Sequence, residues 1–259
     1  TLHSTLHDDD AVIDLHCHYL AAVDDGAKDL QEALALLRAA ERDGARTVVL
    51  TPHVFAGRWD NTLSLLQPRF DAFARLVRTK RIDVELLLGA EVHLLPESLD
   101  LIARGDVPFI GHWEGDQVVL LELHDGRIPP FAREAIRHLK SRDIVPMIAH
   151  PERNKAVMQD PAALEPLLDE GCLLQVTAGA IVGEFGERAR DTALALLDRN
   201  LVAVVASDAH NLRHRPPRLR AARSELKARY GRDVALSLLE QAPREILSVR
   251  RGPTATPKD

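Results

Sequence analysis

The sequence predicts an α/β fold in which strands of a parallel sheet alternate with helices. Short runs rich in leucine and β-branched residues recur along the chain, and segments with helical periodicity separate them. In addition, six of the seven runs carry an acidic residue or a histidine at their last or next-to-last position. In a barrel of parallel strands such ends lie on one face, where the connecting loops converge.

The seven apolar runs have the length of buried strands. They are VIDLH (12–16), TVVLTPH (47–53), VELLLGAE (84–91), VVLLEL (118–123), IVPMIAH (144–150), LLQVT (173–177) and LVAVVASDAH (201–210). We therefore expect seven strands, each followed by a connection that crosses back over the sheet.

The first connecting helix has the clearest signals. Asp29 and Glu32 form a D-x-x-E cap, and Gly44 follows the predicted end of the helix. The apolar stripe consists of Leu30, Ala33, Leu34, Leu37 and Ala40. Further helices are predicted near 62–80, 130–141, 161–170, 187–199 and 216–240.

The domain prediction is a single unit over residues 11–249. No internal repeat, low-complexity tract or linker divides the chain. Residues 1–10 are interpreted as a disordered or expression-derived N-terminus, and residues 250–259 as a frayed C-terminal tail.

Composition excludes several classes of protein. The chain has 259 residues, is 46% hydrophobic and 28% charged, and carries a formal net charge of -6, which does not favour nucleic acid or an anionic membrane as partner. No apolar run is long enough for a membrane span, and TLHSTLHDDD lacks the apolar part of a secretion signal. Two cysteines, Cys17 and Cys172, cannot form a disulfide framework, so we expect a cytoplasmic protein.

The ends of the predicted strands carry side chains that can bind metal ions. These residues are His16, His18, His53, Glu91, Glu122, His150, Asp208 and His210. His16 and His18 are two residues apart and share one side of an extended strand, whereas Cys17 faces the other way and is expected to pack in the core.

Each of these residues also has a simpler interpretation. A single histidine at a strand end is usually a satisfied polar residue, and Asp24 with Asp25 before Gly26 is compatible with a turn. Glu91 and Glu122 follow apolar runs, however, and buried carboxylates need a cation or hydrogen-bond donors. Several carboxylates in one cleft repel one another, so the cluster favours metal ions.

Taken together, the motifs resemble the PHP (polymerase and histidinol phosphatase) superfamily. Within it, the chain is similar to the bacterial metal-dependent protein-tyrosine phosphatases associated with capsule and exopolysaccharide synthesis. The matching stretches are DLHCH, VDDGAKDLQEAL, TVVLTPH, GAEVHLLP, LLEL, IAHPERN and ASDAHNLRHRPP, from about residue 12 to 217. One departure is Val54, where relatives often have a second histidine, and this leaves the substrate contacts near Phe55 to Trp59 open.

The resemblance implies a distorted (β/α)7 barrel of the PHP type, with the active site at the carboxyl ends of the strands. It further implies three divalent ions, expected to be Mn²⁺, with iron or zinc as alternatives. The implied ligand sets are His16, His18, Glu91 and Asp208 for one ion, Glu91, Glu122 and His150 for a second, and Asp25, His53 and His210 for a third.

Such a centre is suited to phosphoester hydrolysis. Three divalent ions and four carboxylates leave roughly two surplus positive charges, which attract a phosphate dianion. The expected nucleophile is a hydroxide that bridges two of the ions and attacks phosphorus in line. Arg153 and Arg215 are expected to clamp the phosphate, with Asp208 and His210 also counted as catalytic, although surface salt bridges would be the simpler interpretation of the two arginines. Trp59 is a candidate to stack on a tyrosyl ring or, more simply, to pack against its own loop.

The expected function is hydrolysis of phosphotyrosine in a protein, with a bacterial tyrosine kinase of capsule or exopolysaccharide synthesis as the expected partner. The alternatives are a phosphoesterase acting on histidinol phosphate, a sugar phosphate or a nucleotide, and a metal-dependent adaptor without enzymatic activity. Thiolate catalysis is disfavoured because Val23 and Ala178, not arginines, lie six residues after the two cysteines. A carboxylated-lysine amidohydrolase is disfavoured because the fourth strand ends in Glu122.

Overall fold

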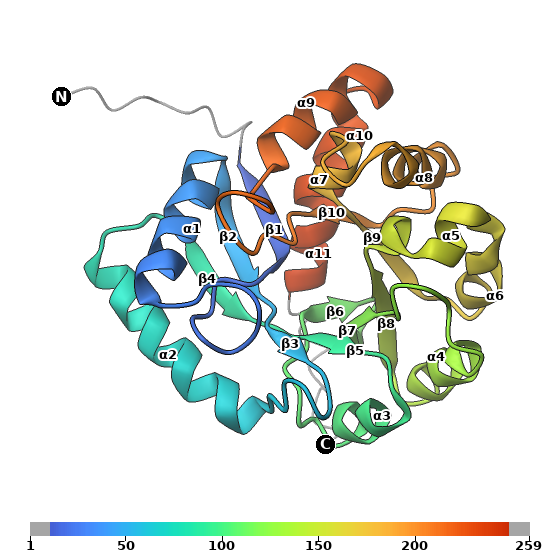
Figure 1. The fold of residues 1–259 in the computed structure, drawn as a ribbon, viewed down its shortest axis with the longest axis horizontal. Helices are drawn as coiled ribbons and strands as arrows, with labels where there is room; N and C mark the ends of the chain where they lie inside the picture. Colours follow the sequence, from blue (N-terminus) through green and yellow to red (C-terminus); the bar gives the residue numbers. More distant parts are fainter. Residues whose placement is uncertain (1–10, 249–259) are drawn as a thin grey trace, which may run out of the picture.

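The computed structural model describes residues 11–248, so the expectations for residues 1–10 and 250–259 lie outside the described range. The described chain has a mixed α/β fold with parallel strands at the centre and helices arranged around them (Figure 1). This confirms the predicted fold class in its coarse form. None of the helices in this range is long and apolar enough to cross a bilayer.

The strands form two sheets. One is the parallel sheet β1-β2-β4, made of Val12–Cys17, Ala45–Leu50 and Glu85–Leu88. The other runs β10-β9-β8-β7-β5-β3, made of Val204–Ala206, Leu173–Thr177, Ile144–Ala149, Asp116–Glu122, Glu91–His93 and His53–Val54, and β6 (Gly111–Trp113) pairs with β7 in the antiparallel sense.

All seven predicted runs contain strands, but the second and third runs are each divided between the two sheets. β2 is followed by β3 after Thr51 and Pro52, and β4 is followed by β5 after Gly89 and Ala90. Pro52 has no N–H to donate to a ladder, which interrupts regular pairing at that point. The peptide N–H of Gly89 still donates to Leu50 at 2.8 Å, so the two interrupted segments stay side by side.

A regular ladder is also missing between β10 and β1, so strand pairing within residues 11–248 does not show a single closed barrel. Instead, the backbone N–H of Asp208 donates to the His16 carbonyl at 2.7 Å, and that of His18 donates to Ala209 at 2.9 Å. The buried Asp14 carboxylate accepts the Ser207 N–H at 2.9 Å and its hydroxyl at 2.6 Å. These bonds form the β1–β10 seam, which joins the first strand to the last.

Helix α1 (Leu30–Arg42) begins with the predicted cap. Asp29 Oδ1 accepts the Glu32 N–H at 2.8 Å, and Glu32 Oε2 accepts the Lys28 N–H at 3.0 Å. Leu30, at the first helical position, is 53% exposed, and Leu36 is buried instead. The other helices are α2 (Leu63–Thr79), α3 (Pro96–Ala103), α4 (Ala132–Lys140), α5 (Lys155–Gln159), α6 (Glu165–Leu168), α7 (Ala178–Ile181), α8 (Glu187–Asp198), α9 (Leu219–Tyr230), α10 (Arg232–Leu236) and α11 (Ala242–Leu247).

Two predicted helices are wrong in extent. The segment 161–170 holds a 3₁₀ turn (Pro161–Leu164) followed by the short α6. The segment 216–240 does not form one helix, because α9 ends where Gly231 takes a left-handed backbone conformation with φ of 90°. A π-helical turn (Ser237–Gln241) then separates α10 from α11.

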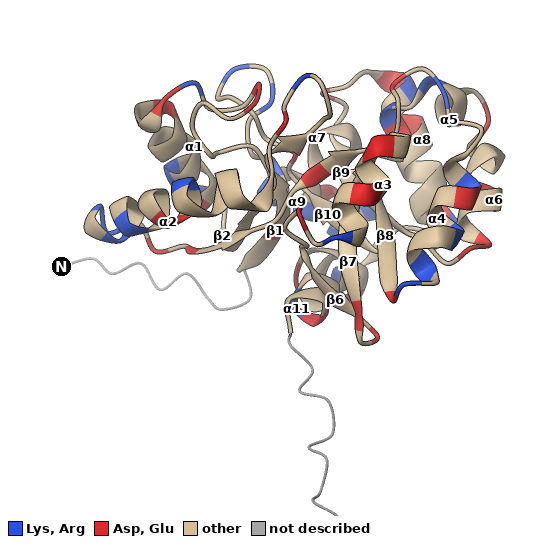
Figure 2. Ribbon diagram, turned by 90° about the horizontal axis from the view of Figure 1, so that it is seen from below, with Lys and Arg blue, Asp and Glu red and all other residues tan. Residues whose placement is uncertain are grey.

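The hydrophobic core consists of two clusters of buried side chains. A large cluster lies between the strands and the surrounding helices, and a smaller one, which includes Leu15, Val49, Leu120 and Met147, is closed by Ile246 of α11. In the side view, α11 and β6 lie on the opposite side of the strands from α1 and α7 (Figure 2). The carboxyl ends of the strands therefore remain free to carry polar side chains.

Candidate metal centre

The exit of β1 supplies two imidazoles to the centre. His16 and His18 are both fully buried, and their Nε2 atoms lie 3.2 Å apart. Cys17 between them points the other way, with its Sγ atom 3.5 Å from the Val49 carbonyl. The alternation along β1 therefore separates the two histidines from the thiol, as the sequence predicts.

Glu91 lies at the middle of the cluster. Its Oε2 atom is 3.2 Å from His16 Nε2, 3.3 Å from His18 Nε2 and 3.0 Å from His53 Nδ1. Its other oxygen is 2.7 Å from His150 Nε2. One buried carboxylate from β5 thus contacts imidazoles carried by three other strand ends.

The remaining predicted ligands surround this carboxylate. Asp208 Oδ1 is 3.3 Å from the Nε2 atoms of both His16 and His18. Asp25 Oδ1 is 3.4 Å from His53 Nε2 and 3.5 Å from His210 Nε2. Glu122 is more peripheral, with oxygens 3.8 Å from His53 Nδ1 and 3.9 Å from His150 Nε2.

All nine predicted ligands therefore gather at one mouth. Donor atoms that lie within 4.8 Å of one another form three groups: His18, Asp25, His53 and His210; His16, Glu91, His150 and Asp208; and His53, Glu91 and Glu122. These groups differ from the ligand sets implied by the resemblance, because His18 falls with the group of Asp25 and His150 falls with the group of His16. His18, for example, also lies 3.2–3.3 Å from donors of the second group. The assignment of each ligand to an ion stays a prediction.

The cluster fits divalent ions on two grounds. Ligand atoms about 2.1 Å from an ion lie about 3.0–3.4 Å from one another in octahedral or tetrahedral coordination, and many donor separations here have that length. In addition, buried polar atoms at the centre lack a hydrogen-bond partner, among them Glu91 Oε2, Asp208 Oδ1 and His210 Nε2. Buried polar atoms are normally paired, so these atoms are suited to bind cations.

Electrostatics keep the central carboxylates ionised. Burial raises the pKa of Glu91, but His16, His53 and His150 outweigh it and hold that pKa well below the usual value. Asp208 is also buried, and its pKa is likewise well below the usual value because Arg153 and other cations face it. Deprotonated carboxylates are the form that binds metal.

Several ligands are oriented by a second hydrogen bond. His16 Nδ1 lies 2.8 Å from Gln175 Oε1, His18 Nδ1 lies 2.8 Å from Asp24 Oδ2, and His210 Nδ1 lies 3.0 Å from the Asp208 carbonyl. Sequence reasoning missed these roles. A glutamine inside the apolar run LLQVT and an acid beside Asp25 were the available signals.

The two predicted arginines converge on one ligand. Arg153 Nη1 donates to Asp208 Oδ2 at 2.6 Å, and Arg215 Nη2 donates to the same oxygen. Their side chains are 19% and 26% exposed, so they are not free surface groups. Because both guanidinium groups use Oδ2, the Oδ1 atom of Asp208 is left to face the imidazoles.

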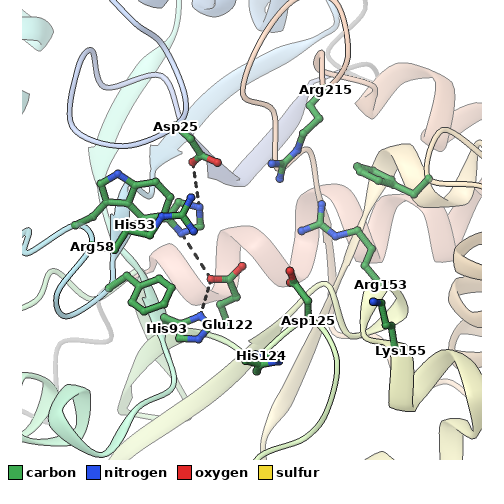
Figure 3. Close-up of a pocket in the computed structure, with 13 residues that line it drawn as sticks. Asp25, His53, Arg58, His93, Glu122, His124, Asp125, Arg153, Lys155 and Arg215 are labelled. Atoms are coloured by element: carbon green, nitrogen blue, oxygen red, sulfur yellow. Dashed lines mark hydrogen bonds and ion pairs between the residues drawn. The ribbon is translucent and has the colours of Figure 1, made fainter.

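A pocket of about 730 Å³ opens beside the cluster (Figure 3). Three predicted ligands, Asp25, His53 and Glu122, form part of its lining. The other lining residues are mostly basic or aromatic: Phe55, Arg58, Trp59, His93, His124, Asp125, Arg153, Lys155, Phe185 and Arg215. The mouth therefore combines anion-binding groups with apolar rings.

One wall of this pocket is a tight hairpin. The backbone groups of Phe55 and Trp59 pair at 2.8 and 2.9 Å, and the two rings stack on histidines of the site. Trp59 lies parallel to His53 with ring centroids 4.8 Å apart, and Phe55 lies parallel to His93 at 4.1 Å. Arg58 lies 4.0 Å from the Trp59 ring. Trp59 thus packs on a predicted ligand and its own loop, the simpler of its two interpretations.

Comparisons with known proteins agree with this geometry. Residues 12–248 match the family model described as capsular polysaccharide synthesis, CpsB/CapC. Tyrosine-protein phosphatase YwqE of Bacillus subtilis is 31% identical over 231 residues, which cover 89% of this chain and 90% of that protein. Tyrosine-protein phosphatase CpsB of Streptococcus pneumoniae is 29% identical over 241 residues, which cover 91% and 98%.

Solved structures give the same result. A structure from the pair YwqE of Bacillus subtilis and CpsB of Streptococcus pneumoniae, described as unique metal-dependent tyrosine phosphatases, matches with a TM-score of 0.83 and 31% identity, covering 93% of this chain and 97% of that one. The lactonase Lmo2620 of Listeria monocytogenes matches with a TM-score of 0.55 at 11% identity, which indicates a shared fold alone. The resemblance inferred from the motifs is confirmed.

Proposed function

Because this chain belongs to the capsular polysaccharide synthesis family CpsB/CapC, we propose that it is a metal-dependent phosphatase that hydrolyses phosphotyrosine in proteins. The observation that carries the proposal is the gathering of nine metal-binding side chains beside two arginines at the mouth of one pocket. The proposal includes three divalent ions, with manganese as the expected metal. It also includes a distorted barrel of the PHP type, in which the β1–β10 seam completes the ring, within a single domain over residues 11–249.

The chain's own residues would bind and orient the phosphate. Bound divalent ions would supply Lewis acidity, neutralising phosphate charge and making a water molecule more acidic. Arg153 and Arg215 face the pocket, and their planar groups can each hold two phosphate oxygens while the charge moves in the transition state (Figure 3). Asp208 holds both guanidinium groups in place before the substrate arrives.

The organic part of the substrate would lie among the apolar rings. Phe55 and Trp59 form one wall, and Phe185 also lines the pocket, with Arg153 packed 4.8 Å from its ring. A tyrosyl group can pack between such rings and exclude water from the reacting centre. Its phenol has a pKa of about 10, so the leaving oxygen needs less protonation than a serine alkoxide would.

The proposed physiological substrate is a phosphotyrosine protein of capsule or exopolysaccharide synthesis, such as a bacterial tyrosine kinase. This part rests on the names of the relatives, which link tyrosine phosphatases with capsular polysaccharide. A cytoplasmic location is part of the proposal, because Cys17 and Cys172 are both buried free thiols.

The test is a phosphatase assay after removal and restoration of metal. The protein is treated with chelator, reloaded with Mn²⁺, and assayed on a phosphotyrosine peptide, the matching phosphoserine peptide, histidinol phosphate, a sugar phosphate and a nucleotide. We expect activity on the phosphotyrosine peptide that disappears with chelation and returns with Mn²⁺. Higher kcat/KM for one of the small metabolites would instead assign the phosphoesterase function, and binding without turnover would assign an adaptor.

Matched variants connect the activity to this centre. His53→Asn removes a histidine of the cluster, whereas His138→Asn changes an exposed histidine of α4. We expect the first variant to lose metal and turnover and the second to keep both. Equal activity of the two variants would contradict the assignment of the site.

A further inference from the structure

Asp24 lies next to a predicted ligand, but its carboxylate belongs to none of the three donor groups of the centre. Its side chain is fully buried, and its Oδ2 atom lies 2.8 Å from His18 Nδ1 and accepts the backbone N–H of His53 at 2.9 Å. Its Oδ1 atom accepts the N–H of Gly26 at 3.0 Å. One carboxylate therefore contacts the side chain of one ligand and the backbone of another.

These bonds determine which nitrogen of His18 can bind metal. Both Asp24 oxygens already accept backbone N–H groups, Oδ2 that of His53 and Oδ1 that of Gly26, so the carboxylate meets His18 as an acceptor. His18 Nδ1 must then carry a proton. The lone pair of Nε2 is directed at the cluster, where Glu91 Oε2 and Asp208 Oδ1 both lie 3.3 Å away.

The same carboxylate also positions the group formed by Asp25 and His53. It holds the N–H of His53, and Asp25 is its neighbour in the chain, with Oδ1 at 3.4 Å from His53 Nε2. The turn itself is tightly packed, because a Cβ atom added at Gly26 would lie 2.1 Å from the His18 carbonyl oxygen. Movement of Asp24 would thus disturb His18 and the Asp25–His53 pair together.

Of the three histidine ligands His16, His18 and His210, whose Nδ1 atoms each meet an orienting group, His18 is the one whose partner is a carboxylate. His16 Nδ1 meets the neutral amide of Gln175, and His210 Nδ1 meets a backbone carbonyl. A carboxylate on the remote nitrogen makes an imidazole a stronger metal ligand than an amide does. The charge of Asp24, and not only its shape, should therefore affect ion binding.

We propose that Asp24 is a positioning residue that orients ligands of two neighbouring ion sites with one carboxylate, whereas Asp25 is the direct ligand. The proposal rests on the metal dependence contained in the proposed function, but not on the identity of the substrate. It also gives a role to Asp24, which the motif match that selects Asp25 as a ligand leaves without one.

The first test measures Mn²⁺ binding to full-length, chelator-stripped protein by competition with a chromophoric chelator. The variants are Asp24→Ala, Asp24→Asn and, as a control for the lost charge, Asp125→Ala, which removes an exposed acid at the same mouth. We expect Asp24→Ala to weaken the affected sites by roughly 10- to 100-fold. Asp24→Asn should lose less, because an amide oxygen can still accept these bonds, and Asp125→Ala should bind as the wild type does.

The second test reads the tautomer of His18 directly in the wild-type protein. Nitrogen-15 spectra of Zn²⁺-loaded protein distinguish a protonated Nδ1 from a protonated Nε2. We expect protonated Nδ1 in the wild type. This measurement decides the question even where Asp24→Ala fails to fold, because a protonated Nε2 on His18 would overturn the proposal.

The two proposals fail in different ways. Unchanged Mn²⁺ affinity in Asp24→Ala, or a loss equal to that of Asp125→Ala, overturns the role of Asp24 while leaving phosphatase activity possible. A protein whose Mn²⁺ affinity depends on Asp24 but that does not hydrolyse phosphotyrosine peptide overturns the function alone. A fall in the melting temperature of the ion-free Asp24→Ala variant without any change in ion affinity would assign Asp24 a purely structural role.

Discussion

Replacing Arg153 by alanine separates phosphate binding from the support of a metal ligand. Its guanidinium donates to Asp208 Oδ2 at 2.6 Å and lines the pocket. The same Asp208 oxygen accepts a second bond from Arg215, so Asp208 keeps one charged partner in the Arg153→Ala protein. We therefore expect near-normal metal content and a specific loss of turnover.

The size of the loss follows from the contact that disappears. A charge-assisted hydrogen bond contributes about 1.5–3 kcal/mol, which corresponds to roughly 10- to 150-fold in kcat/KM. The assay is steady-state hydrolysis of a phosphotyrosine peptide, with bound Mn²⁺ measured on the same sample. Arg153→Lys should fall between the wild type and Arg153→Ala, because the charge remains while the two-pronged geometry is lost.

Two controls make the result decisive. Arg137→Ala removes an exposed arginine of α4 that pairs with Glu170, and it should leave kcat/KM unchanged. The double variant that lacks Arg153 and Arg215 should lose more metal than either single variant, because both guanidinium groups that hold Asp208 are then removed. A loss of activity in Arg153→Ala that only matches its loss of metal, or a change below about twofold, would refute the phosphate clamp.

Three further outcomes follow from the structure. Gly26→Ala should destabilise the protein, seen as a lower melting temperature, because the new Cβ would lie 2.1 Å from the His18 carbonyl oxygen; an unchanged melting temperature would contradict this packing. Thiol reagents should leave the native protein unlabelled and active, because burial raises the pKa of Cys172 to about 12 and that of Cys17 well above its usual value; rapid alkylation with loss of turnover would count against the metal-centred chemistry. Hydrogen bonds from two arginines of α4 lower the pKa of Glu170 to about 2, so its contribution to stability is fully present above pH 4.5 and is lost as the pH falls toward 2. The difference in melting temperature between wild type and Glu170→Gln should shrink over that range, and a constant difference would show that this pairing does not contribute.

The fold could be predicted from sequence as far as local signals reach. The helix after Asp29 was placed correctly because its cap and its buried face are both encoded within a few residues. The division of two strand runs at Pro52 and Gly89 was not predicted, because it depends on which neighbours the chain meets on either side of the break. Gly231, which ends α9, is a local stop signal in the sequence, but the helical pattern continues beyond it and the break was therefore not predicted.

The site was predictable for a different reason. Parallel strands bring their carboxyl ends to one face, so residues as distant as His16 and Asp208 could be expected to meet. Partners that orient the ligands could not be placed in this way. Gln175 lies inside a strand and Asp24 inside a turn, and only three-dimensional contacts show that each holds an imidazole.

The β1–β10 seam has a consequence for how the chain is made. Asp14 and Ser207, which join across it, are 193 residues apart, and the predicted ligands His16 and Asp208 on the two sides of the seam are almost as distant in the sequence. During synthesis His16 leaves the ribosome long before Asp208 exists. Completion of the donor set, to which the segment after β10 adds Asp208 and His210, must therefore be a late event, and a nascent or truncated chain that ends before β10 offers only an incomplete set of donors.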